Sequence, residues 1–226
     1  MVGYGHHGQT PRVAEAEDLQ RRLRSQVDLS SRLESRPRSV VGLDVSYEKE
    51  TNRVCAAAVV IELETLEVRE TSLCFGEAAF PYVPGLLAFR EVPILTEALA
   101  RLASDVEVLV CDGYGIAHPR RFGLACHVGV VTGLPSFGVA KTPFTAGFVE
   151  PEAGRGSWSP LSEEGEVLGR ALRTQNEVKP VFVSVGHRIG LDQACELTLA
   201  LSPRYRIPEA VRQADIASRR ALRLPR

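Results

Sequence analysis

One stretch constrains the fold more than any other, the residues VLVCDGYGIAHPRRFG at positions 108–123. Residues 108–111 form a short apolar run, rich in β-branched side chains and bounded by turn residues, which predicts a fully buried strand. Asp112 follows at the carboxyl end of that strand, where open α/β sheets place their ligands. Gly113 and Gly115 come next, and glycine lets a ligand approach the backbone closely. We therefore expect half of a functional site at this end of a buried strand.

The rest of the sequence predicts an α/β fold with one mixed sheet flanked by helices. A flexible tail is expected over 1–9, and Thr10 and Pro11 have the character of a helix N-cap and first helical residue. The expected elements, in chain order, are a helix over 11–27, strands over 39–48, 53–62 and 66–77, a helix from about 85, a strand over 108–111, a helix over 120–132, strands over 135–140, 167–172 and 181–185, and helices over 191–201 and 208–222. The first three strands, joined by short polar turns such as 49–52, form an antiparallel meander. Strands that begin as a meander and then alternate with helices indicate a single domain over 10–226.

Composition limits the class of protein. The 226 residues are 44% hydrophobic and 24% charged, as in ordinary globular proteins. No apolar run approaches the roughly 18 residues of a membrane span, and the N-terminus lacks a signal-peptide pattern, so we expect a cytoplasmic protein without a membrane partner. The net charge of −1 neither supports nor excludes a nucleic-acid partner. The cysteines lie in apolar segments without a C-x-x-C motif, which indicates buried free thiols; they are Cys55, Cys74, Cys111, Cys126 and Cys195.

Three carboxylates lie in apolar elements without an obvious cation beside them. Asp44 interrupts an apolar strand, on the face opposite to the valines and leucine that precede and follow it. Glu91 shares a helical stripe with leucines at i±4 spacing and therefore faces inward, with a kink expected beside it at Pro93. Asp112 is the third acid. A buried carboxylate is costly unless it is paired or bound to a cation.

These acids indicate a hard divalent cation, Mg²⁺ with Mn²⁺ as a possible substitute, because oxygen ligands select such ions. Two ions about 3.5–4 Å apart would clamp the attacking and leaving oxygens of an in-line phosphoryl displacement. Lys141, which ends an apolar strand, and His118 are candidates to contact phosphate or to position water. The alternative is three unrelated acids, each paired to an arginine.

Six motifs occur in order along the chain: GLDVSY at 42–47, PYVPGLLAFRE at 81–91, CDGYGIAHPRRFGLACHVG at 111–129, GVAK at 138–141, SVGHRIGLD at 184–192 and IPEAVRQAD at 207–215. Together they resemble the endonuclease V family, the inosine-directed nucleases of the ribonuclease H-like superfold. The resemblance spans about residues 12–220.

The resemblance implies roles for individual residues. Asp44, Glu91 and Asp112 match the metal-binding acids of the family, and Asp215 falls where members carry an aspartate or histidine near the metals. Tyr82 matches the aromatic wedge of the P-Y-x-P loop, which fills the gap left in the duplex. His118 and Lys141 match residues at the scissile phosphate. The backbone and side chains that resemble the pocket for the flipped hypoxanthine base are those of Leu87, Gly113, Gly115 and Leu124.

The resemblance also implies the reaction. Members hydrolyse the second phosphodiester bond on the 3′ side of the deaminated base and leave a 3′-hydroxyl and a 5′-phosphate. We therefore expect an Mg²⁺-dependent, monomeric DNA repair endonuclease that acts on deoxyinosine in single- or double-stranded DNA. An inosine-specific endoribonuclease is the alternative within enzymes, and a non-catalytic nucleic-acid-binding module is the alternative from another class.

Several residues keep a second interpretation. Tyr82 could be an ordinary half-buried tyrosine and His118 a simple loop histidine. Arg120 and Arg121 are either solvated surface or DNA-binding phosphate contacts that supply salt-dependent affinity. His187 is interpreted as structural. The Gly- and Pro-rich segment 142–159 is expected to be a loop or lid that could reshape substrate access.

Overall fold

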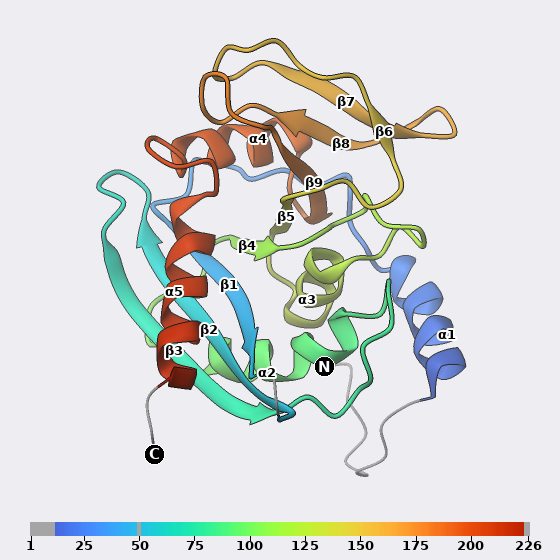
Figure 1. Ribbon diagram of the computed structural model, residues 1–226, viewed down its shortest axis with the longest axis vertical. Helices are drawn as coiled ribbons and strands as arrows, with labels where there is room; N and C mark the ends of the chain where they lie inside the picture. Colours follow the sequence, from blue (N-terminus) through green and yellow to red (C-terminus); the bar gives the residue numbers. More distant parts are fainter. Residues whose placement is uncertain (1–11, 49–50, 224–226) are drawn as a thin grey trace.

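The strand that ends in Asp112 lies inside a single sheet, which has nine strands within residues 12–48 and 51–223, the residues that this computed structural model describes. The strand order is β3-β2-β1-β4-β5-β9-β8-β7-β6 (Figure 1). The strands are β1 Ser39–Tyr47, β2 Arg53–Glu62, β3 Val68–Glu77, β4 Leu109–Asp112, β5 Ser136–Ala140, β6 Gly147–Phe148, β7 Trp158–Glu163, β8 Glu166–Leu172 and β9 Val181–His187. The helices are α1 Val13–Arg24, α2 Ala88–Ala100, α3 Leu124–Thr132, α4 Leu191–Ala200 and α5 Glu209–Arg223.

The pairing confirms the predicted mixed sheet. β1, β2 and β3 form the antiparallel meander. β4 joins β1 in parallel and β5 joins β4 in parallel, so the carboxyl ends of these three strands meet at one edge of the sheet. The remaining strands, β9, β8, β7 and β6, continue the sheet in antiparallel order.

Different helices cover the two faces of the sheet. On one face, α4 and α5 pack on alternate residues of β1 and β4, among them Val40 and Val110. On the other face, α2 and α3 pack on Val41 and Leu43. Figure 1 shows α5 in red, lying across β1 and β2. This close packing requires Gly42, because a Cβ atom there would lie 2.1 Å from the carbonyl oxygen of Ala210 on α5.

Three predicted helices begin later than expected, among them the helix expected from about 85, which begins at Ala88. The helix predicted over 11–27 spans Val13–Arg24, with Arg12 as its N-cap. The helix predicted over 120–132 begins at Leu124, because the glycine-rich segment before it forms a loop in which Gly123 donates its N–H to the Gly115 carbonyl at 2.9 Å. The predictions for the tail 1–9, for Thr10 and Pro11, and for part of the turn 49–52 lie outside the described residues.

The segment 142–159 is not wholly a loop, which corrects the prediction. It contains β6 and the first two residues of β7, which pairs with β8 along its length. The hairpin lies beside α4, at the top of Figure 1. β7 and β8 pair across a turn at 164–165. The Gly- and Pro-rich composition of the segment 142–159 gives no alternating pattern from which a strand could be predicted.

The cysteines and the helices can be compared with the predictions made from composition. All five cysteines are buried and free, as predicted. Among the described residues, no helix combines the length and the hydrophobicity that crossing a membrane requires.

Candidate active site

Asp44 and Asp112 are brought together by the pairing of β1 with β4. The parallel register pairs Val41 with Leu109 and Leu43 with Cys111, so the next pair along is Asp44 and Asp112. Neighbouring strands lie about 4.8 Å apart. Both carboxylates line one cleft at the carboxyl edge of the sheet. We expected half of a site at the end of β4, and the other half is Asp44 on β1.

Two further elements complete this cleft. Lys141 follows β5, and its Nζ atom lies 2.5 Å from Oδ2 of Asp112. Asp215 comes from α5, where it accepts an ion pair from Nε of Arg219 at 2.7 Å. On the same helix, Ser218 donates its hydroxyl to Oδ2 of Asp44 at 3.1 Å.

The acids of the site repel one another. Burial, and then the charges of Asp112 and Asp215, raise the pKa of Asp44 to about 6, while the Ser218 hydroxyl and Lys141 oppose the shift. Burial also raises the pKa of Glu91 to about 8, against the hydrogen bond that Tyr47 donates to it at 2.9 Å. Strongly perturbed carboxyl groups beside a cleft are typical of functional sites.

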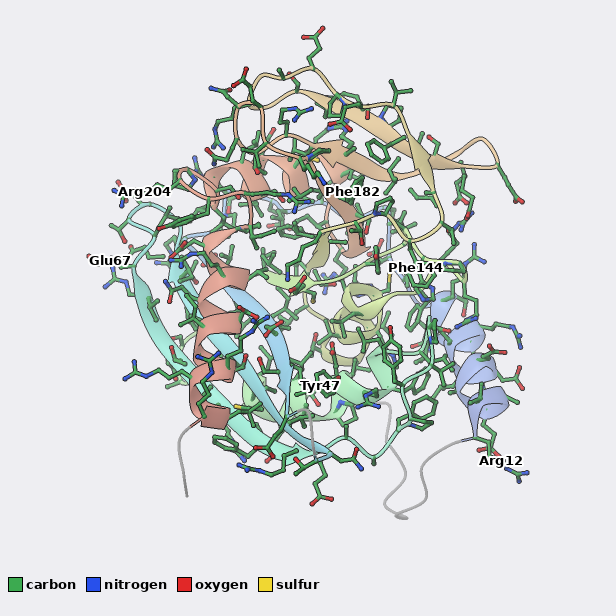
Figure 2. The ribbon with its side chains drawn as sticks, viewed as in Figure 1. Arg12, Tyr47, Glu67, Phe144, Phe182 and Arg204 are labelled. Carbon is green, nitrogen blue, oxygen red and sulfur yellow. The ribbon has the colours of Figure 1, made fainter. Side chains whose placement is uncertain are left out.

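Glu91 stands slightly apart from the other acids. It is buried on the inward stripe of α2, as predicted, and its side chain is held by Tyr47 at the end of β1 (Figure 2). It is not among the residues that line the cleft. The charges of Asp44 and Asp112 nevertheless reach Glu91, where they add to the effect of burial in raising its pKa.

The donor set suits a hard divalent cation. Four carboxylates line the cleft: Asp44, Asp112 and Asp215, and also Glu48, which is paired with Arg53. The repulsion among the three aspartates is relieved there only in part by Lys141. A divalent cation would remove that repulsion, and oxygen donors are what such ions select. Within the described residues, no three acidic, histidine or cysteine side chains already converge on a single ion position. The residues present therefore fit the metal by chemistry, with Lys141 and Arg219 as the counter-ions of the metal-free acids.

A second, more enclosed pocket lies next to the cleft, under the loop that carries Tyr82. Its volume is about 180 Å³, many times the roughly 10–15 Å³ that one water needs. Tyr82 stands at its mouth with 71% of its surface exposed. The residues that line it include three predicted from the sequence, Leu87, Gly113 and Leu124, and also Gln20, Tyr114 and Phe144, which were not. Phe144, labelled in Figure 2, packs edge-on against Tyr114.

His118 lies in this second pocket and not among the residues that line the acidic cleft. Its Nε2 atom is 3.1 Å from the carbonyl oxygen of Gly85, and its Nδ1 accepts the Arg120 N–H at 3.2 Å. Burial, and then the nearby Arg120 charge, lowers the pKa of His118 to about 4. The imidazole is therefore neutral at pH 7.

The two arginines after His118 are engaged inside the protein. Arg120 donates to the carbonyl of Gly85 at 2.9 Å and to the side chain of Gln20. Arg121 pairs with Glu163 at 2.6 Å and Glu166 at 2.7 Å, across the β7–β8 turn. Neither guanidinium lines the acidic cleft or the second pocket.

Gly115 and His187 also have partners within the fold. A Cβ atom on Gly115 would lie 2.0 Å from the Val185 carbonyl, and its N–H donates to Oγ of Ser184 at 2.8 Å. Gly115 thus faces β9, whereas Gly113 lines the pocket. His187 accepts the Asp28 N–H at 3.1 Å, which agrees with its interpretation as structural.

Sequence reasoning missed Tyr114 in the second pocket and four other residues that support these sites. Ser218, Tyr47, Gln20 and Phe144 each contact a site residue or line a pocket. Gln20 had a usable signal, because it is a polar residue on the apolar stripe of the first helix. Ser218 and Tyr47 had none, since their partners are 174 and 44 residues away in the chain.

Comparison with known proteins gives a consistent picture. A family model described as Endonuclease V matches residues 21–216. A protein named Endonuclease V from Streptomyces avermitilis is 59% identical over 184 residues, which cover 81% of this chain and 80% of the relative. Another, from Nostoc sp., is 41% identical and covers 97% of this chain and 100% of the relative.

Solved structures agree with this. The crystal structure of Endonuclease V from Streptomyces avermitilis superposes with a TM-score of 0.90 at 54% identity, covering 95% of each chain. The catalytic domain of human Endonuclease V gives a TM-score of 0.87 at 38% identity, covering 94% of this chain and 98% of that one. Endonuclease V of Ciona intestinalis, in complex with a 24mer DNA containing an inosine followed by a ribo-adenosine, gives 0.80 at 27% identity, covering 93% and 97%.

Proposed function

The chain belongs to the endonuclease V family and is a nuclease, and on this premise we propose that it cleaves DNA at deoxyinosine, at the second phosphodiester bond on the 3′ side of the lesion, with Mg²⁺. One observation carries the proposal: the acidic cleft, with Asp44 and Asp112 at paired positions, lies next to a pocket beneath an exposed tyrosine. This arrangement sets a site for phosphate chemistry beside a site for a flipped base.

In this proposal the acids hold the metal. Asp44 and Asp112 are its ligands, Asp215 approaches from α5, and Glu91 contributes from α2. When bound, the divalent cation supplies neutralisation of the negative charge that develops on the phosphate. Ser218 keeps the Asp44 carboxylate in place, and Tyr47 does so for Glu91.

Lys141 contacts the scissile phosphate in this proposal. Its ammonium group lies on Asp112 in the metal-free protein and is 47% exposed. A bound cation would compete with this ammonium group for the carboxylate, and the flexible lysine side chain would then be free to contact a phosphate oxygen. His118, which is neutral, shapes the neighbouring pocket by its contact with Gly85.

The pocket receives the lesion base in this proposal. A base must leave the helical stack before it can be inspected, which requires a few kcal/mol and less at a mispaired inosine. Tyr82, held between two prolines, stacks in the vacancy and offsets part of that energy. Hypoxanthine carries a carbonyl oxygen where adenine has an amino group, so a backbone N–H near Gly113 would favour inosine and leave adenine unpaired.

The test is cleavage by an Asp112→Ala variant. We expect the parent to cut an inosine-containing strand with Mg²⁺ and leave 5′-phosphate ends, and we expect the variant to lose the activity while it keeps its fold by circular dichroism. An Arg36→Ala variant, altered far from the cleft, serves as the control. A variant that cuts as fast as the parent would refute the site.

A second candidate substrate is inosine in RNA. The Ciona relative is bound to DNA in which a ribo-adenosine follows the inosine, and this supports testing ribose at that position. Side-by-side cleavage of matched DNA and RNA strands, each with one inosine, separates the two substrates. The intact set of acids argues against a non-catalytic binding module.

We propose further that residues 10–226 act as a single catalytic domain and as a monomer. The support for one domain is that β1–β9 form one sheet, whose two faces carry the buried clusters of α4 and α5 and of α2 and α3.

A further inference from the structure

The last two turns of α5 form one wall of the acidic cleft. Arg219 and Arg223 line it, opposite the carboxyl end of β1 and the Asp112–Lys141 pair. Asp215, Arg219 and Arg223 are spaced by four residues and therefore share one side of the helix. The rise of an α-helix puts the two arginines roughly 6 and 12 Å beyond Asp215 along its axis. The cleft thus carries two arginines along α5 beyond Asp215, and Glu48, which also lines it, is paired with Arg53.

These two arginines are available to a ligand. Among the described residues, Arg219 pairs only with Asp215, and 61% of its side chain is exposed, so this ion pair stabilises the fold little. In residues 12–48 and 51–223, Arg223 forms no ion pair at all. Arg120 and Arg121 differ, because buried or half-buried partners hold them inside the protein.

We propose that Arg219 and Arg223 bind phosphate groups of the nucleic-acid strand, so that the strand passes the acids and continues along α5. The proposal rests on the proposed function, because it takes the strand to lie in the acidic cleft. A polyanion entering a cleft with Asp44, Asp112 and Asp215 needs cations beyond Lys141 to offset the repulsion. The planar guanidinium group matches phosphate oxygens with two parallel hydrogen bonds.

In this proposal Arg219 can pair with either of two groups, the carboxylate of Asp215 or a phosphate of the strand. In the free protein it neutralises Asp215, and with substrate it exchanges that carboxylate for a phosphate. Its removal should therefore affect the metal and the nucleic acid in opposite directions. Without Arg219, Asp215 loses a competing cation and attracts a metal ion more strongly, while the strand loses a contact.

Binding in EDTA tests the contact without cleavage. We would measure the affinity of the full chain for a labelled inosine oligonucleotide by fluorescence anisotropy, at KCl concentrations of about 50–200 mM. Arg219→Ala and Arg223→Ala should each weaken binding several-fold and reduce the slope of log K against log[salt] by about 0.7–0.9, the change for one phosphate contact. Arg223→Lys should restore the slope, because it keeps the charge.

Arg220→Ala is the matched control. Arg220 is on the same helix and equally exposed to solvent, but it does not line the cleft, so the slope should equal that of the parent. In calorimetric titration with Mn²⁺, Arg219→Ala should bind the ion at least as tightly as the parent. A structural role for Arg219 would weaken metal and oligonucleotide together, and that result would overturn the proposal.

The two proposals fail in different ways. A parent protein that cuts no inosine strand with any divalent cation would refute the proposed function. A parent that cuts such strands, with salt slopes unchanged in both alanine variants, would refute only the arginine contacts.

Discussion

The side-chain amide of Gln20 donates to the carbonyl oxygen of Gly85 at 3.0 Å, and it does so from a fully buried position on α1. The same carbonyl also receives Arg120 at 2.9 Å and contacts His118 at 3.1 Å. Gly85 has a φ of +81° and directly follows the loop that carries Tyr82. Three side chains from two distant segments therefore fix one backbone atom at the base of the proposed wedge.

Replacement of Gln20 by alanine should destabilise the protein and weaken recognition of inosine. The change removes the donors to Gly85 and Phe122 and leaves these carbonyls without that partner, which costs about 1–3 kcal/mol when a buried group is involved. Urea unfolding measures the stability, and steady-state kinetics should show a raised KM with a smaller change in kcat. If Gln20 acts through the wedge, Gln20→Ala should add little to the KM of a Tyr82→Ala variant. Additive effects would contradict that route.

The sequence was sufficient for the parts of the site that depend on strand order. The pattern of apolar residues identified Asp44 and Asp112 as acids in or at the end of apolar strands, and the family resemblance implied that these strands are neighbours, which the pairing of β1 with β4 bears out. The positions of Arg120 and Arg121 did not follow, because a surface arginine and one held by Gln20 or Glu163 have the same local sequence. Burial by a segment some 40 or 100 residues away is a tertiary property.

The two strands at one edge of the sheet, β6 and β7, could not be predicted from the sequence either. β6 has two residues, and β7 begins inside a segment rich in glycine and proline, so neither shows the alternation that predicts a strand. β7 is held in the sheet by pairing with β8, and β6 by pairing with β7. Arg121 adds ion pairs to Glu163 and Glu166 on either side of the turn.

Gly42→Ala should separate α5 from the sheet. The added Cβ would meet the backbone of Ala210 at 2.1 Å, and backbone cannot rotate away as a side chain can. Overpacking of this kind costs typically about 1–3 kcal/mol, and it should also lower Mn²⁺ affinity because α5 carries Asp215 and Ser218. Thermal unfolding and calorimetric titration measure the two effects. Gly147→Ala is the control, since its new Cβ would have 3.9 Å to the nearest atom; equal losses in both variants would contradict the explanation.

The metal-free stability should depend on pH through Asp44. The pKa of Asp44 is about 6 in the folded protein and 3.8 in the unfolded chain, so the folded state binds the proton more tightly. The contribution of this group is therefore full below about pH 4 and is lost as the pH rises through 6. An Asp44→Asn variant removes the titration and keeps an acceptor for Ser218. In EDTA it should be close to the parent at pH 4 and more stable by about 1–3 kcal/mol at pH 8.

Urea unfolding at these two pH values checks the prediction, because the difference between parent and variant cancels the titration of the other acids. The opposite result would be a variant that is less stable than the parent at pH 8, with a larger deficit at pH 8 than at pH 4. It would show that the surroundings stabilise the ionised Asp44. The Mn²⁺ affinity of the parent should rise over the same interval, since the ion requires the ionised carboxylate.

Tyr82→Ala should weaken binding to inosine DNA while leaving the metal site unchanged. Tyr82 is 71% exposed and lines the second pocket, and it is not among the residues that line the acidic cleft. Loss of a stacking aromatic costs about 1–3 kcal/mol per base, which corresponds to a fall in affinity of roughly 5- to 150-fold. Anisotropy in EDTA gives the affinity, and Mn²⁺ titration should give the value of the parent. Tyr82→Phe keeps the ring and should bind like the parent. If parent and Tyr82→Ala both bind inosine and undamaged duplex with equal affinity, Tyr82 has no part in recognition.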